Sequence, residues 1–181
     1  MNSGRVAIRY AKGLLKFGNQ KGISDQLYVD AITLIQVIKN SESLVNLLGD
    51  PTISYNQKIE ILRKSLSDVH PDFIEYLSMI VQKGRFEYIH NSLLLFCDIY
   101  RIENNILHVI IESANILPEQ ELKEIESFIV QKYNKSVELV SIIKPELIAG
   151  YVLIVDGKIL DYSVSGQLVQ CRKSLGLSFS N

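Results

Sequence analysis

The sequence predicts an α+β protein, in which an N-terminal bundle of about six helices is followed by a small α+β domain that contains a β-hairpin. Up to about Asn105, the apolar residues recur every three or four positions, which is typical of amphipathic helices. After Asn105, this helical period ends and short runs of β-branched and other apolar residues follow. The clearest is Tyr151–Val155, which Asp156-Gly157 joins to a second apolar run, as in a type I′ hairpin.

The composition limits the classes of function. A chain of 181 residues forms one domain or two small ones, and we expect two, residues 1–105 and 106–181. Lys and Arg total 19, Asp and Glu total 20, and the basic residues are spread out, so no nucleic-acid partner is expected. The sequence contains no signal-peptide pattern and no apolar run of the ~20 residues that span a bilayer. Direct insertion into a membrane is therefore not expected.

Local signals mark several helix boundaries in the first half. Ser54-x-x-Gln57 is a capping box, in which each side chain binds the other residue's backbone amide. Pro71 suits the first turn of a helix, and Gly84 suits the position after its end. We expect Arg85 to begin the last and longest helix of the bundle.

Two of the predicted helices have unusually wide apolar faces. On a helical wheel, the apolar residues of 6–17 and of 73–81 each cover about 200°, whereas a helix on one core needs little more than about 100°. Two interpretations remain open from the wheel. Either these are central helices that neighbours cover on all sides, or they form a groove that accepts an amphipathic helix from another chain.

The second half predicts the order strand, helix, strand, strand, strand, helix. The strands are Ile106–Ile111, Val137–Ile143 and the two arms of the hairpin, and Pro118 begins the first helix. Because Tyr151–Val155 shows no polar alternation, we expect both of its faces to be covered. The buried side of the first helix is predicted to be Leu122, Ile125, Phe128 and Ile129, and the stripe of the last helix to be Val164, Leu168, Cys171 and Leu175.

No set of residues predicts catalysis. The three histidines, His70, His90 and His108, are far apart, and the two cysteines lie on apolar stripes. The glycines form neither a phosphate-binding loop nor a dinucleotide fingerprint. We therefore predict no catalytic residue, no metal site and no cofactor, which favours a structural protein over an enzyme.

The hairpin region carries a family resemblance. The order Leu147-Ile148-Ala149-Gly150, Asp156-Gly157 and Asp161-x-Ser163-Val164-x-Gly166-x-Leu168 resembles the C-terminal signature of the δ subunit of F-type ATP synthases. The mitochondrial member of this family is the oligomycin-sensitivity-conferring protein. Arg9-Tyr10-Ala11-Lys12 resembles the family's opening helix, and Lys83-Gly84-Arg85 resembles the boundary after its fifth helix. The family has two adjacent glycines where this chain has Ala149-Gly150, so only one of these positions can need a positive φ.

The resemblance implies two protein partners. The groove between the first and fifth helices is expected to bind the N-terminal helix of the ATP synthase α subunit, and the second half to contact the C-terminal helices of the b subunits. The candidate contacts with the α subunit are Ala7, Tyr10, Leu14, Ile74, Leu77, Ile80 and Val81. The weaker candidates for the b subunits are Val164, Leu168 and Leu175, although covering their own sheet is the more frequent role of such a stripe.

The implied function is mechanical. A δ subunit is a non-catalytic connector of the peripheral stalk, or stator, and ties the catalytic head to the membrane-anchored b subunits during proton-driven ATP synthesis. The expected location is the cytoplasmic face of the bacterial inner membrane, where the complex holds the chain as a peripheral protein. The alternative is a peptide-binding adaptor in an unrelated assembly.

Overall fold

The computed structural model describes residues 3–50, 52–66, 69–147, 149–164 and 166–168. The chain divides into two compact units, Met1–Tyr100 and Arg101–Asn181, a few residues before the division expected from the change in apolar period. Among the described residues, no helix has the length and the apolar content needed to cross a bilayer.

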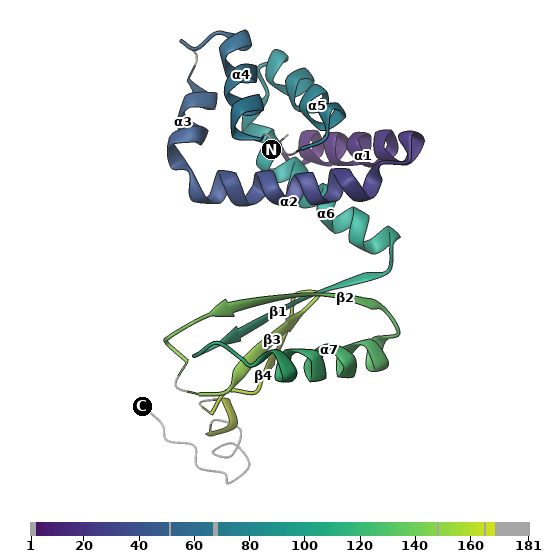
Figure 1. The fold of residues 1–181 in the computed structure, drawn as a ribbon, viewed down its shortest axis with the longest axis vertical. Helices are drawn as coiled ribbons and strands as arrows, with labels where there is room; N and C mark the ends of the chain where they lie inside the picture. Colours follow the sequence, from purple (N-terminus) through teal and green to yellow (C-terminus); the bar gives the residue numbers. More distant parts are fainter. Residues whose placement is uncertain (1–2, 51, 67–68, 148, 165, 169–181) are drawn as a thin grey trace. The chain divides into compact units, whose positions relative to one another are not determined.

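The first unit is built from helices (Figure 1). Its large apolar side chains form the core, and Leu14, Leu27, Phe73, Leu77 and Phe96 are each less than 2% exposed. The helices are α1 (Ser3–Lys21), α2 (Ser24–Asn40), α3 (Glu42–Gly49), α4 (Tyr55–Ser65), α5 (Pro71–Gln82), the 3₁₀ helix η1 (Phe86–Tyr88) and α6 (Ile89–Glu103).

The short-range helix signals act as the sequence predicts, with one exception. Both hydrogen bonds of the Ser54/Gln57 capping box are present, and Pro71 is the first residue of α5. Gly84 has a φ of +65° and follows Lys83, the C-cap residue of α5. The prediction that Arg85 begins the longest helix is wrong, because one 3₁₀ turn comes first and α6 has 15 residues against 19 in α1. A sequence pattern does not separate such a turn from the helix that follows it.

The second unit is a four-stranded sheet with the order β2-β1-β3-β4, and α7 lies along one face of it (Figure 1). Strands β1 and β2 are parallel and are joined through α7, whereas β3 is antiparallel to both β1 and β4. The fold class α+β is therefore confirmed. The elements are β1 (Ile106–Ser113), α7 (Glu119–Tyr133), β2 (Ser136–Ile143), β3 (Tyr151–Val155) and β4 (Lys158–Asp161).

The sheet buries one face more completely than the other. The core lies between α7 and the sheet. It contains Leu107, Val109, Ile111, Ile129, Leu153 and Val155, each at most 4% exposed. Val152 and Ile154 point to the opposite face and are only partly buried by the described residues. Within the described residues, full burial of β3 is therefore confined to one face, and the covering of its second face stays a prediction. Phe128, predicted to be buried, is 58% exposed, because the apolar arc of α7 is wider than its contact with the sheet.

The hairpin and the turn after it show how the C-terminal signature folds. Asp156 and Gly157 have φ values of +47° and +78°, as a type I′ turn requires. The Asp161 carboxylate accepts a hydrogen bond from the Ser163 amide, and the Ser163 hydroxyl accepts one from the Gly166 amide. These bonds start a helical segment at Val164. Cys171 and Leu175 lie outside the described residues.

Candidate partner-binding surfaces

Helices α1 and α5 lie side by side and run in opposite directions. At one end, the Lys21 ammonium lies 2.8 Å from the Asp72 carboxylate, which joins the end of α1 to the start of α5. Farther along, the Tyr76 hydroxyl donates to the Tyr10 carbonyl at 2.8 Å. Arg85, after the end of α5, donates to the Tyr10 hydroxyl at 3.0 Å. These contacts join α1 to the first two turns of α5 and to Arg85 beyond its end.

Between the two helices lies a hollow of about 410 Å³, which we call the α1/α5 groove. Aromatic rings, a methionine and a glycine make its lining predominantly apolar. The residues that line it are Arg9, Tyr10, Gly13 and Phe17 from α1, and Glu75, Tyr76 and Met79 from α5. Met79 is 38% exposed, so the groove offers an apolar side chain to a partner.

The seven residues predicted to contact the α subunit are all buried in the bundle. Of the seven, Tyr10 alone lines the α1/α5 groove. Their exposed fractions are 1% for Ala7, 7% for Tyr10, 0% for Leu14, 6% for Ile74, 0% for Leu77, 0% for Ile80 and 7% for Val81. A helical wheel gives the width of an apolar face but not which edge a neighbouring helix covers. The other six residues therefore support the groove from the core and do not form its surface.

Gly13, Phe17 and Met79 line the α1/α5 groove but were not among the predicted contacts. Gly13 had a recognisable signal, since a glycine inside a helix costs about 1 kcal/mol relative to alanine. A Cβ atom at Gly13 would meet no atom within 4 Å, so packing within the chain does not require glycine at this position. An open position in the wall of a groove allows another backbone to approach closely.

Two hydrogen bonds join the residues at the floor of the groove. Tyr76 is 9% exposed, and burial, followed by the nearby Tyr10, raises the pKa of its hydroxyl above the usual value of 10.0. The hydroxyl therefore stays protonated at physiological pH and remains a donor to the Tyr10 carbonyl. Tyr10 is held at its hydroxyl by Arg85, so both ends of this residue have a partner.

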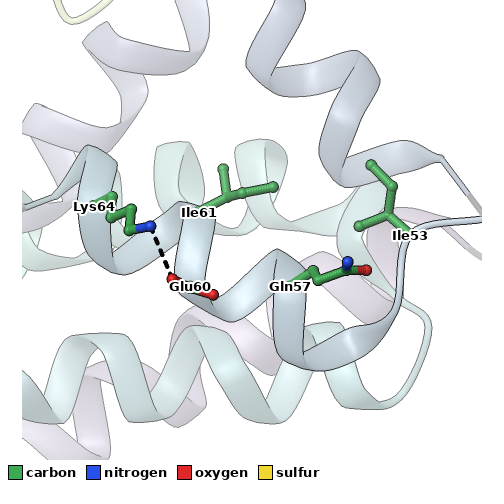
Figure 2. A pocket seen from close by; sticks show the side chains of 5 residues that line it. All are labelled: Ile53, Gln57, Glu60, Ile61 and Lys64. Carbon is green, nitrogen blue, oxygen red and sulfur yellow. Dashed lines mark ion pairs between the residues drawn. The ribbon is translucent and has the colours of Figure 1, made fainter.

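A second hollow of the first unit has a different construction. It has a volume of about 260 Å³ and lies along α4 and the turn before it, where Figure 2 shows its side chains. An ion pair of 2.8 Å between Lys64 and Glu60 crosses its lining. Because one helix supplies nearly all of its lining, this hollow lacks the two walls that a docked helix needs.

The second unit has an exposed apolar surface of its own. A hollow of about 330 Å³ is lined by Glu124, Ile125, Phe128, Tyr151, Leu153 and Tyr162. Of the predicted b-subunit contacts, Val164 and Leu168 are 41% and 60% exposed, and Leu175 lies outside the described residues. We call Phe128, Tyr162, Val164 and Leu168 the C-terminal apolar surface.

Comparison with known proteins identifies the family. The model of the ATP synthase delta (OSCP) subunit family matches residues 6–175. The chain belongs to this family. It is 29% identical over 171 residues to the ATP synthase subunit delta of Lactobacillus gasseri, covering 94% of each chain. It is 28% identical over 177 residues to that of Bdellovibrio bacteriovorus, covering 97% of each.

A solved structure shows the same fold. A chain in the cryo-EM structure of the Toxoplasma gondii mitochondrial ATP synthase hexamer superposes with a TM-score of 0.70 at 22% identity, and the match covers 99% of both chains. As a member of the delta (OSCP) family, the chain is a non-catalytic stator subunit of an F-type ATP synthase and is peripheral to that complex. The family membership excludes the alternative of an adaptor in an unrelated assembly.

Proposed function

We propose that the α1/α5 groove binds the N-terminal helix of an ATP synthase α subunit, and that the second unit binds the C-terminal helices of the b subunits. The chain then ties the catalytic head to the membrane-anchored stalk at the cytoplasmic face of a bacterial inner membrane. The observation that carries this proposal is the groove itself, a two-walled apolar hollow in the surface of a packed helical unit.

The lining of the α1/α5 groove suits an amphipathic helix. Such a helix places apolar side chains at i, i+3, i+4 and i+7 into a hydrophobic groove. Phe17 and Met79 offer apolar contact, and a flexible methionine adapts to the shape of the inserted side chains. Gly13 leaves room for the helix backbone. Because Tyr10 and Tyr76 are already hydrogen-bonded, the floor loses little conformational freedom when a helix binds.

The C-terminal apolar surface supports the second contact. Phe128 and Leu168 are 58% and 60% exposed, and both Phe128 and Tyr162 line the hollow beside α7. A group of exposed apolar side chains marks a protein interaction site more often than a scattered single residue does. A connector under mechanical load needs slow release, and large apolar interfaces provide it.

The groove is tested with a synthetic N-terminal peptide of an α subunit and the full chain. We expect Met79→Glu to weaken binding at least about tenfold, because docking would bury an unpaired carboxylate. The matched control is Leu94→Glu on α6, since Leu94 is 41% exposed and does not line the groove. Fluorescence anisotropy measures the affinity, and circular dichroism verifies the helix content. Lack of saturable binding, or equal weakening by both variants, would refute the proposed site.

The stalk contact is tested with a soluble fragment that contains the C-terminal helices of b subunits. Leu168→Asp is expected to weaken its binding to the full chain at least about tenfold, for the same reason. Ile116→Asp is the control, because Ile116 is 81% exposed and lies outside the C-terminal apolar surface. If both variants bind the fragment as tightly as the unchanged chain, the b subunits contact another surface.

A further inference from the structure

The two walls of the α1/α5 groove carry opposite charges. Helix α1 has basic residues and no acidic one, whereas α5 has Asp72 and Glu75 and no basic residue. The basic residues of α1 are Arg5, Arg9, Lys12, Lys16 and Lys21.

Arg9 and Glu75 are the residues that place opposite charges in the lining of the groove. Both line the hollow from opposite walls, and both are exposed. Lys21 and Asp72 already neutralise each other at one end of the groove. Within the part of the chain that the structure describes, neither Arg9 nor Glu75 has an ion-pair partner, and Arg9 contacts the Tyr10 ring at 5.9 Å from its centroid. Two opposite charges are therefore available to a ligand, one on each wall.

The direction of a docked helix decides which of its edges faces each wall. An amphipathic helix has two polar edges, one on each side of its apolar stripe. When the helix is turned end to end with its stripe still in the groove, the two edges change places. If one edge is acidic and the other basic, only one direction pairs the acidic edge with α1 and the basic edge with α5.

Building on the proposed function, we propose that Arg9 and Glu75 select both the ligand and its direction. The preferred ligand is an amphipathic helix with an acidic edge beside α1 and a basic edge beside α5. Exposed ion pairs stabilise a contact modestly, and we expect roughly a two- to fivefold change in affinity for each pair. Charges arranged in this way act mainly on specificity and on the rate of association.

The first test uses three synthetic helical peptides with the same apolar stripe and the full chain. One peptide has an acidic and a basic edge, one has two acidic edges, and one has two basic edges. We expect the first to bind roughly two- to fivefold more tightly than the others at low salt, and the difference to shrink in about 1 M salt, where the Debye length is about 3 Å. Equal affinities at low salt would overturn the inference.

The second test determines the direction in which the bound peptide lies along the α1/α5 groove. A nitroxide at the peptide N-terminus broadens NMR amide signals at one end of the groove, either near Lys21 or near Arg85. Exchanging the wall charges with Arg9→Glu and Glu75→Arg together should preserve the affinity of the mixed-edge peptide and move the broadening to the other end. The control exchanges the Glu60 and Lys64 ion pair of α4, which leaves the net charge unchanged and should leave the direction unchanged.

The outcomes separate this inference from the proposed function. Broadening at the same end in the unchanged chain and in the charge-exchanged variant would refute the selection of direction while leaving the groove as the binding site. A reversal caused by the α4 exchange would also refute it. Failure of all three peptides to bind would refute both the proposed groove and the inference.

Discussion

Replacing Gly150 tests whether the C-terminal signature needs a glycine at this position. Both its backbone conformation and its close contacts suggest that it does. Its φ is +83°, in the left-handed region, and an added Cβ would lie 2.5 Å from the Tyr162 carbonyl oxygen and 2.9 Å from the Ser163 Cα. The left-handed backbone costs a non-glycine residue about 1–2 kcal/mol, and overpacking costs about 1–3 kcal/mol more. Since the obstructing atoms belong to the backbone, no rotamer change relieves the overlap. We expect Gly150→Ala to lower the free energy of unfolding of the second unit by about 2–5 kcal/mol.

Gly157→Ala is the matched control. Gly157 has a φ of +78°, but no atom lies within 4 Å of the position of an added Cβ, so this variant should lose only about 1–2 kcal/mol. Hydrogen exchange of the β1 amides measures the free energy of unfolding of the second unit, and amides of α1 report on the first. If Gly150→Ala is no more destabilising than Gly157→Ala, the close approach of Gly150 to Tyr162 does not limit the size of the residue.

Two further variants test the first unit. Ser54→Ala should lower its stability by about 1 kcal/mol through loss of the capping box, whereas exposed Ser65→Ala, at the end of the same helix, should have little effect in urea unfolding. Burial and the hydrogen bond to Asp25 raise the pKa of Tyr100 from 10.0 to about 12, so the free energy of unfolding should fall as the pH rises through this range. Tyr100→Phe should reduce that fall, and an unchanged slope in alkaline urea titrations would contradict it.

The features that the sequence predicted correctly depend on residues close together in the chain. The Asp156-Gly157 turn requires positive φ at two adjacent positions, and the Ser54/Gln57 capping box joins residues three positions apart. Gly84 ends α5 through its own backbone conformation. Such patterns act within one turn, so the neighbouring residues are enough to specify them.

The surface of the α1/α5 groove was less predictable. The sequence drew attention to α1 and α5, which line a hollow, but Leu77 and Ile80 lie in the core while Met79 lines the groove. These residues are close neighbours on one helix, and only the packing of the other helices decides which of them is covered. The bond between Tyr10 and Arg85 joins residues that are 75 positions apart, a distance that no periodicity describes.

The sequence by itself determined the α+β class, most of the element boundaries and the family. The class and the boundaries depend on the conformations of residues that are close together in the chain. The family depends on the order of glycines and polar residues in one short signature. The tertiary structure alone decided which edges of α1 and α5 remain open, and it placed Arg9 and Glu75 on opposite walls of one groove. The physical reason is that burial and electrostatic pairing depend on which distant segments come together, and a helical period does not contain that information.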